Sequence, residues 1–198
     1  MNKQSKVTGV ILAGGLARRM NKQDKGLVDF NGQPMISYAV QAMTPVVDEL
    51  LVNANRNIEQ YKLFTYPVIS DVTSDFDGPL AGIYAALNVC QNEVLLVMPC
   101  DSPFITAEGL TTLLNERVRC DADIAVAFDG ERLHPVFLAL KTSLKDSLQD
   151  YLAQGERKID RWIEQHNWVK VDFSASPEFF ENINTLEQLH ELSAKGEL

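Results

Sequence analysis

Short apolar runs alternate with longer stretches of helical period along most of this 198-residue chain. The strand-length runs occupy residues 7–13, 49–53, 67–70, 93–99 and 124–128. Between them, apolar stripes with helical spacing occupy 35–43, 83–89 and 110–118. Several of the short runs are apolar throughout, which is typical of parallel strands covered on both faces. The alternation therefore predicts an open, mostly parallel α/β sheet with helices on both faces.

The C-terminal part of the chain continues this pattern after a hairpin. Asp129-Gly130 is a strong turn signal between the run 124–128 and a further apolar run at 136–140. A helix is expected at 144–152, a strand at 169–173 and a closing helix at 185–194, where Thr185 and Gln188 have the spacing of a capping box. No repeat, low-complexity segment or linker interrupts the sequence, so residues 1–198 are expected to form a single domain.

Composition and charge exclude several classes of protein. Hydrophobic residues make up 45% of the chain, which is enough for one substantial core. The formal net charge of -9 argues against a nucleic-acid surface, because phosphate backbones require broad basic faces. No run approaches the roughly 20 apolar residues of a membrane span and no secretory signal is evident, so we expect a cytoplasmic protein without a membrane partner. Cys90, Cys100 and Cys120 are expected to be reduced thiols, because their number and spacing suit neither a disulfide framework nor a tetrahedral metal site.

The first apolar run ends at two glycines, and a concentration of positive charge follows. Gly14 and Gly15 permit positive φ angles and let backbone N–H groups approach a bulky anion. Four cations follow within eight residues: Arg18, Arg19, Lys22 and Lys25. The segment has neither the ending of a Walker A loop nor the Gly-x-Gly-x-x-Gly pattern. In an acidic chain it favours a polyphosphate site over a tight turn with solvated basic residues.

Two polar residues at other strand ends are further candidates, because ligands bind at the carboxyl edge of an open α/β sheet. Asn53 and Asp71 each follow an apolar run. In a ligand crevice, a carboxylate can accept hydrogen bonds from the N1–H and amine edge of guanine, or from a ribose hydroxyl. Alternatively, both residues are ordinary turn and helix-capping residues. The residues alone leave both interpretations open.

A single carboxylate, Asp101, follows the apolar run 93–99 in a turn stiffened by Pro99 and Pro103. It serves either as a turn acceptor or as a ligand of Mg²⁺, which takes one or two protein carboxylates together with phosphate oxygens and water. Its strand belongs to the same predicted sheet as the glycine loop. That placement favours metal binding.

The remaining candidates are less specific. Gly78-Pro-Leu-Ala-Gly82 either offers free helix N–H groups to an anion or only marks a helix start, and we favour the helix start. A second anionic substrate has five candidate contacts: Arg132, His134, Arg157, Asn182 and Asn184. The two asparagines are also candidates for reaching the metal. Each has a simpler alternative: surface charge for the arginines, a structural role for the histidine before a proline, and capping of the last helix for the asparagines.

Together these residues resemble the molybdenum cofactor guanylyltransferase family, within the superfamily of Mg²⁺-dependent nucleotidyltransferases. The motifs follow the family's order and span nearly the whole chain: Leu12-Ala-Gly-Gly-Leu-Ala-Arg-Arg-Met20, Asp24-Lys-Gly-Leu27, Asn53-Ala-Asn-Arg56, Gly78-Pro-Leu-Ala-Gly82, Pro99-Cys-Asp101, Asp129-Gly-Glu-Arg132 with His134-Pro135, and Asn182-Ile-Asn-Thr185. One departure is Asn21, where the family usually has glycine; asparagine is the other residue that best tolerates positive φ.

The resemblance implies a Rossmann-like fold of the nucleotide-diphospho-sugar transferase type. It also implies transfer of GMP from GTP to the terminal phosphate of molybdenum-loaded molybdopterin, with release of pyrophosphate. By position, the implied GTP contacts are Leu12, Ala13, Gly14, Gly15, Lys25, Asn53 and Asp71, and Asp101 holds Mg²⁺. Lys25, Arg19 and Asp101 then form the catalytic set, which offsets charge at the α-phosphate and the leaving pyrophosphate. The implied protein partners are molybdenum-insertion proteins and molybdoenzymes or their chaperones, bound transiently.

Two other kinds of function are compatible with the same motifs. A cytidylyltransferase for the same pterin or a sugar-1-phosphate nucleotidylyltransferase would keep the chemistry, although the Ala-Gly-Gly form of the loop goes with guanine in the family. A nucleotide-binding scaffold would turn nothing over, and it has no need of a metal ligand such as Asp101 at the α-phosphate. The enzyme hypothesis depends on one geometric condition, that Gly14 and Asp101 converge on one triphosphate.

Overall fold

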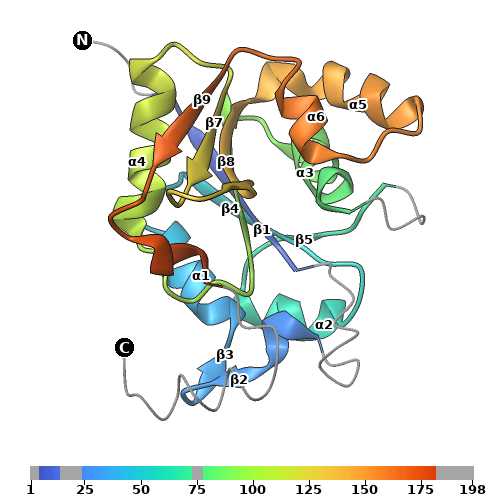
Figure 1. Ribbon diagram of the computed structural model, residues 1–198. Helices are drawn as coiled ribbons and strands as arrows, with labels where there is room; N and C mark the ends of the chain where they lie inside the picture. Colours follow the sequence, from blue (N-terminus) through green and yellow to red (C-terminus); the bar gives the residue numbers. More distant parts are fainter. Residues whose placement is uncertain (1–4, 14–23, 73–77, 182–198) are drawn as a thin grey trace.

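The computed structural model describes residues 5–13, 24–72 and 78–181, which build a seven-stranded sheet with helices on both faces (Figure 1). The strands lie in the order β5-β4-β1-β6-β8-β7-β9. Their bounds are Val7–Leu12 (β1), Glu49–Asn53 (β4), Val68–Ile69 (β5), Val94–Pro99 (β6), Ile124–Phe128 (β7), Leu133–Lys141 (β8) and Trp168–Asp172 (β9). A separate small sheet pairs β2 (Asp29–Phe30) with β3 (Gln33–Pro34).

Every strand of the large sheet runs in the same direction except β8. β1 pairs in parallel with β4 and β6, β4 pairs with β5, and β7 pairs with β9. β8 is antiparallel to both β6 and β7. The expected open, mostly parallel sheet is therefore confirmed. β7 and β8 form the hairpin predicted from Asp129-Gly130, and β8 begins earlier than the expected run 136–140.

Helices cover both faces of this sheet. The α-helices are Ile36–Met43 (α1), Ile58–Tyr61 (α2), Pro79–Val89 (α3), Ala107–Arg119 (α4), Lys145–Ala153 (α5) and Ile159–Ile163 (α6), and the 3₁₀ turns are Lys25–Leu27 (η1), Lys62–Phe64 (η2), Thr142–Leu144 (η3) and Pro177–Phe180 (η4). α1 and α4 lie on one face, and α3, α5 and α6 lie on the other (Figure 1). The expected helix at 185–194 lies outside the described residues. Among the described helices, none is long and apolar enough to cross a membrane.

Successive side chains of one strand enter two separate hydrophobic cores. Along β6, Val94, Leu96 and Met98 pack into the core beneath α1 and α4. Leu95 and Val97 pack into the core beneath α3, α5 and α6. All five are buried. This two-sided burial explains why the strand runs are apolar throughout and do not alternate with polar residues.

The connections between strands fix where a ligand can bind. From β1 the chain moves outward to β4 and β5, and it then returns to the other side of β1 as β6. The strand order therefore reverses between β1 and β6. In open α/β sheets, ligands bind at the carboxyl ends of the strands next to such a reversal.

Candidate active site

The carboxyl ends of β1, β4 and β6 lie side by side at the point where the strand order reverses. Leu12 pairs with Pro99, and the N–H of Cys100 donates to the carbonyl of Leu12 over 3.1 Å. On the other side, the N–H of Ala13 donates to the carbonyl of Asn53 over 2.8 Å. The described chain thus leaves β1 at Ala13 beside the strand end that carries Asp101. Three other predicted site residues, Gly14, Gly15 and Arg19, lie outside the described residues.

Lys25 and Asp101 form an ion pair at this edge of the sheet. The distance from Nζ of Lys25 to Oδ2 of Asp101 is 2.9 Å, although the residues are 76 positions apart in the sequence. The exposed fractions of the two side chains are 25% and 13%, so both are shielded but reach solvent. An ammonium and a carboxylate placed together can bind a nucleotide–metal complex jointly. The lysine then contacts the phosphate oxygens, and the aspartate contacts the cation.

Asp101 suits the way in which proteins hold a nucleotide-bound magnesium ion. Within residues 5–13, 24–72 and 78–181, no group of three or more His, Cys, Asp or Glu side chains could form a metal cage. Mg²⁺ does not require one, because it is commonly bound by one or two carboxylates, substrate phosphates and water. A partly exposed carboxylate beside the Lys25 ammonium therefore fits Mg²⁺ held jointly by protein and substrate.

The strand ends of β4 and β5 bring Asn53 and Asp71 together. Nδ2 of Asn53 donates to Oδ1 of Asp71 over 2.9 Å, and Nδ2 of Asn55 donates to Oδ2 over 2.7 Å. The backbone N–H of Asp71 donates to Oδ1 of Asn55 over 2.8 Å. The Asp71 carboxylate is thus fixed in orientation by two carboxamides. Each carboxylate oxygen can accept a further hydrogen bond, so the guanine-binding interpretation retains a geometric basis.

α3 begins in the Gly78–Gly82 motif and approaches the site closely. Gly78 is the N-cap, and Pro79 lies in the first turn. A Cβ on Gly82 would lie 2.9 Å from Cδ2 of Leu12 and 3.0 Å from Cγ of Asn53. The motif is a helix start, as favoured from the sequence, and it also supplies the side-chain-free position against which Leu12 and Asn53 pack. Direct contact of the helix N-terminus with an anion, the interpretation that the sequence did not favour, is not required by this packing.

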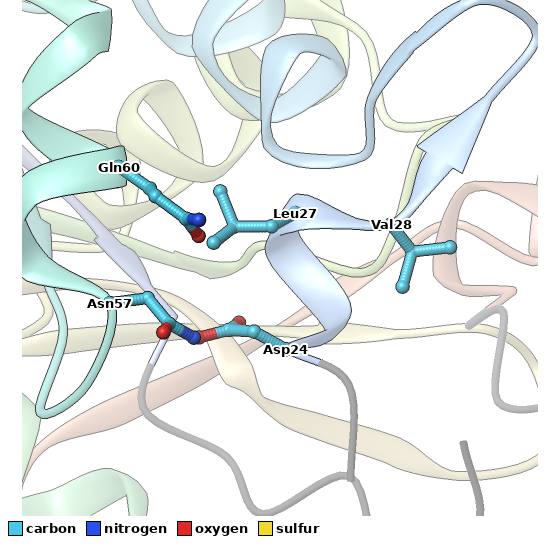
Figure 2. A pocket seen from close by; sticks show the side chains of 5 residues that line it. All are labelled: Asp24, Leu27, Val28, Asn57 and Gln60. Carbon is cyan, nitrogen blue, oxygen red and sulfur yellow. The ribbon is translucent and has the colours of Figure 1, made fainter. Parts of the chain in front are cut away.

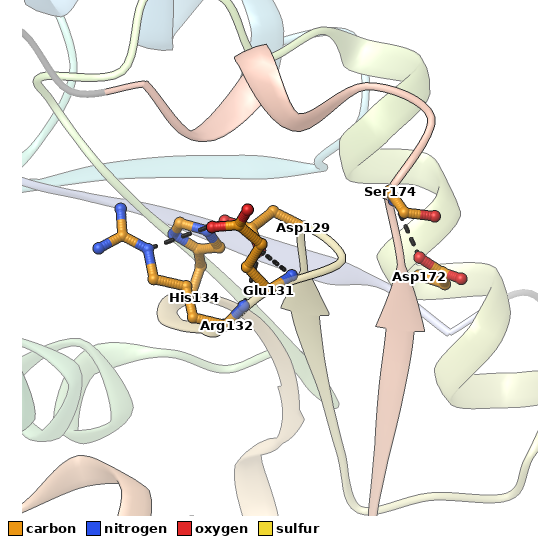
Figure 3. A network of polar contacts seen from close by, with 6 residues as sticks. All are labelled: Asp129, Glu131, Arg132, His134, Asp172 and Ser174. Atoms are coloured by element: carbon orange, nitrogen blue, oxygen red, sulfur yellow. Dashed lines mark hydrogen bonds and ion pairs between the residues drawn. The ribbon is translucent and has the colours of Figure 1, made fainter.

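A second polar network lies at the same edge, where β7 ends and β8 begins (Figure 3). Oδ1 of Asp129 accepts hydrogen bonds from the backbone N–H groups of Glu131 and Arg132, each over 2.8 Å. Nε2 of His134 lies 2.6 Å from Oδ2 of the same carboxylate. The backbone N–H of Arg132, followed by His134 and the N–H of Glu131, holds the pKa of the Asp129 carboxyl well below its usual range.

The contacts of the five residues predicted to bind the second, anionic substrate differ, and they favour some of these residues over others. His134 is buried, and its ring stacks on Phe180 with centroids 4.4 Å apart, which agrees with a structural role. Arg132 forms an ion pair with Asp129, with 3.7 Å between Nε and Oδ2, but 75% of its side chain is exposed at the hairpin, where an anionic substrate can reach it. Arg157 lies between α5 and α6 and donates from Nη1 to the carbonyls of Leu152 and Glu156. Asn182 and Asn184 lie outside the described residues.

The structure gives a place at the site to a residue that the sequence analysis named only within the motif Asp24-Lys-Gly-Leu27 and assigned no role. Asp24 precedes Lys25 and borders a cavity of about 220 Å³ that Leu27, Val28, Asn57 and Gln60 also line (Figure 2). Its carboxylate accepts a hydrogen bond from Asn57, and Tyr61 donates to it from α2. The one available signal was local: an aspartate two residues before a glycine is typical of a capped turn. The partners from α2 have no such signal.

The family model of the MobA-like NTP transferase domain matches residues 9–171, which include Lys25, Asn53, Asp71 and Asp101. The chain belongs to the MobA-like NTP transferase family. It is 49% identical to the molybdenum cofactor guanylyltransferase of Shewanella sediminis, over 94% of this chain and 95% of that protein. The enzyme of the same name from Shewanella piezotolerans is 46% identical, over 94% of this chain and 92% of its own length.

A solved structure supports the same fold. The molybdopterin-guanine dinucleotide biosynthesis protein A of Archaeoglobus fulgidus superposes with a TM-score of 0.79 at 24% identity, covering 96% of this chain and 98% of that one. The expected nucleotide-diphospho-sugar transferase fold is confirmed, and this MobA-like chain is a nucleotidyltransferase. The roles of its individual site residues stay predictions.

Proposed function

We propose that this chain is a molybdenum cofactor guanylyltransferase that transfers GMP from GTP to the terminal phosphate of molybdenum-loaded molybdopterin and releases pyrophosphate. The observation that carries the proposal is the Lys25–Asp101 pair at the reversal of strand order, beside Leu12 and Ala13. Relatives of this name share 49% and 46% of its residues over nearly the full length. The proposal treats residues 1–198 as one nucleotidyltransferase domain that acts in the cytoplasm.

The residues of the site position two polyanions and offset their charge. An oxygen of the acceptor phosphate is already a nucleophile, so neither a covalent enzyme intermediate nor a strong base is required. It attacks the α-phosphorus of GTP, the bond to the bridging oxygen breaks, and pyrophosphate leaves with the bonding electrons. Lys25 donates to phosphate oxygens, and Gly14, Gly15 and Arg19 complete the phosphate site. Asp101 would hold Mg²⁺, which when bound would supply Lewis-acid neutralisation of the charge that develops on the phosphates.

Asp71 provides the basis for choosing guanine over cytosine. Its two carboxylate oxygens match the adjacent N1–H and exocyclic amine donors of guanine. Cytosine presents one amine donor next to a ring nitrogen that accepts, so the same carboxylate would face an acceptor. Asn53 and Asn55 fix the carboxylate in place through hydrogen bonds of 2.9 and 2.7 Å. A site built in this way rejects the base that leaves its polar groups unpaired.

The decisive experiment is incubation of the protein with Mg²⁺, molybdenum-loaded molybdopterin and either GTP or CTP. Mass spectrometry of the dinucleotide and an assay for pyrophosphate should both report turnover with GTP. Lys25→Ala and Asp101→Ala should each lose turnover by at least about a hundredfold, the scale for preorganised electrostatic groups. Equal use of CTP, or no pyrophosphate with either nucleotide, would contradict the proposal.

A second ion pair supplies matched controls for these variants. Nζ of Lys141 lies 2.8 Å from Oδ1 of Asp123, and the side chains are 36% and 32% exposed. Asp123 precedes β7, so this pair lies at the opposite edge of the sheet from Asp101. Lys141→Ala and Asp123→Ala should keep wild-type turnover.

The proposal also covers the partners of the reaction. GTP and molybdenum-loaded molybdopterin are the substrates, and molybdenum-insertion proteins and molybdoenzymes or their chaperones bind transiently to deliver and receive the cofactor. Arg132 is the favoured acceptor contact among the described residues, because its exposed guanidinium lies at the carboxyl end of β7.

A further inference from the structure

Asp24 is a buried carboxylate that the reaction does not use directly. Its exposed fraction is 8%, and it is the N-cap of η1, the turn that carries Lys25. Oδ1 accepts a hydrogen bond from the N–H of Gly26 over 3.3 Å and another from the hydroxyl of Tyr61. Oδ2 accepts from Nδ2 of Asn57 over 3.0 Å, a contact visible in Figure 2. Three donors from two separate elements therefore meet on one side chain.

Tyr61 is the deepest member of this group. It is completely buried at the end of α2. Burial, followed by the neighbouring Cys100 and the hydrogen bond to Asp24, raises the pKa of the Tyr61 hydroxyl far above its usual range. The hydroxyl therefore keeps its proton and acts as a fixed donor to the Asp24 carboxylate.

Gly26 completes the contact between η1 and the end of β6. A Cβ on Gly26 would lie 3.2 Å from Sγ of Cys100 and against the Tyr61 ring, whose Cε1 would also be 3.2 Å away. Cys100 is buried and is followed by Asp101 in the chain. The backbone of η1, which carries Lys25, thus packs directly against Cys100, the neighbour of the proposed metal ligand Asp101.

These contacts explain how the flexible side chain of Lys25 is held in position at the site. A lysine side chain has four rotatable bonds, so its ammonium is held at a phosphate only if its backbone is fixed. Lys25 lies between Asp24 and Gly26, and the contacts of these two neighbours fix the backbone on either side of it. Its Nζ then reaches Asp101 at 2.9 Å.

We propose that Asp24 is a positioning residue for the transfer reaction, which fixes η1 on Tyr61 and Asn57 so that Lys25 meets the phosphates beside Asp101. The inference rests on the proposed function. A simple turn cap would need only the Gly26 N–H and does not account for the two donors from the region of α2. Asp24 is 8% exposed and accepts three hydrogen bonds from the protein, so the contacts described for its carboxylate are structural ones.

The test uses substitutions that keep shape and change hydrogen bonding. In Asp24→Asn an amide replaces one acceptor oxygen, so an N–H faces either Asn57 or Tyr61, both of which donate. We expect kcat to fall roughly ten- to a hundredfold, the effect of a displaced catalytic group, while KM for GTP changes less. Tyr61→Phe removes one of the three donors to Asp24, so it should also lower kcat, but by less than Asp24→Asn does.

Two matched substitutions control for general effects on folding. Asp29 accepts a hydrogen bond from the N–H of Gly32 over 3.1 Å but is exposed on β2. Tyr66 contacts Thr44 through its hydroxyl, with 3.2 Å between the oxygens, and lies before β5. Asp29→Asn and Tyr66→Phe should keep the wild-type kcat.

A double-mutant cycle with Lys25 distinguishes positioning from general loss of structure. If Asp24 acts through Lys25, Asp24→Asn should cost little further activity in a Lys25→Ala background. A full additional loss in that background, or an unchanged kcat in Asp24→Asn alone, would overturn the inference. If Asp24→Asn does not fold, as judged by its thermal transition, the same cycle with Tyr61→Phe decides. Failure of the proposed function is a separate result, since the wild-type protein would then release no pyrophosphate from GTP.

Discussion

At the scale of single residues, Asp129 links the hairpin to the pH dependence of stability. Its lowered pKa has three causes: the backbone N–H of Arg132, then His134, then the N–H of Glu131. An unfolded chain returns the carboxyl to a pKa of about 3.9. Because the folded pKa is lower, the ionised carboxylate stabilises the fold above about pH 4, and this contribution is lost as the pH falls toward the folded pKa.

We therefore expect Asp129→Asn to lower the free energy of unfolding near neutral pH. The gap between wild type and variant should narrow as the pH drops below about 4, because protonation removes the same interactions from the wild type. Urea denaturation across this range measures both effects. Asp150→Asn, at an exposed position on α5, is the control and should follow the wild-type curve. A gap that stays constant with pH would contradict the assignment.

The site residues that could be predicted from the sequence are those at strand ends. Asn53, Asp71 and Asp101 each follow an apolar run, and the parallel sheet brings them to one edge. Asp24 could not be predicted in the same way. Its partners Asn57 and Tyr61 are 33 and 37 positions away, at the N-cap and at the end of α2, a helix of four residues that is too short to show a period.

At the scale of elements, the approach of α3 to the sheet depends on Gly82. The helix lies over β1 and β4, and a Cβ at this position would contact the side chains of Leu12 and Asn53. Both are flexible at their ends, so we expect them to move rather than the helix. Gly82→Ala should therefore displace the Asn53 amide from Asp71 and weaken GTP binding roughly tenfold, which is the scale of one lost hydrogen bond.

The helix itself should tolerate this change, because alanine favours a helix over glycine by about 1 kcal/mol. Isothermal titration with GTP and Mg²⁺ measures the affinity, and urea denaturation measures the stability. Gly109→Ala is the matched control: Gly109 is a helical glycine on α4 whose added Cβ would meet Ile105 and Phe179. It should leave GTP affinity unchanged. Equal loss of affinity in both variants would mean that Gly82 has no special relation to the site.

The elements themselves were largely predictable, and the differences have a common cause. The main strands and the helices α1, α3, α4 and α5 were expected, because each has a clear hydrophobic period or a continuous apolar run. β2, β3, α2 and α6 have two to five residues each, and no period is visible over so few positions. The hairpin was predictable from its turn, but the insertion of β8 between β6 and β7 is a long-range pairing without a local signal.

At the scale of the whole molecule, the proposed base-recognition residue and the proposed metal ligand lie at different strand ends along one edge of the sheet. Asp71 follows β5 at one end of the strand order, and Asp101 follows β6, three strands further in. In the proposed function the first carboxylate recognises the base and the second holds the metal. Because β4 and β1 lie between them, each carboxylate can be removed without changing the contacts of the other.

Thermal stabilisation by nucleotides should therefore have two components, the preference for GTP over CTP and the effect of Mg²⁺. Separate substitutions should remove them independently. A ligand at a hundred times its Kd stabilises the folded state by about 2.7 kcal/mol, which a melting curve resolves easily. In the wild type, GTP with Mg²⁺ should raise Tm more than CTP with Mg²⁺, and more than GTP with EDTA. Asp101→Ala should abolish the effect of Mg²⁺ but keep the preference for GTP. Asp71→Ala should abolish the preference and keep the effect of Mg²⁺.

Asp123→Ala, at the far edge of the sheet, is the control and should retain both components. The outcome that contradicts this division is the loss of both components in each single variant, since that would mean the two carboxylates act as one site. If Asp101→Ala instead retained both the preference for GTP and the effect of Mg²⁺, Asp101 would not be the ligand of the metal. The crossed pattern of losses is expected because the base and the metal reach the protein at different strand ends of the same sheet.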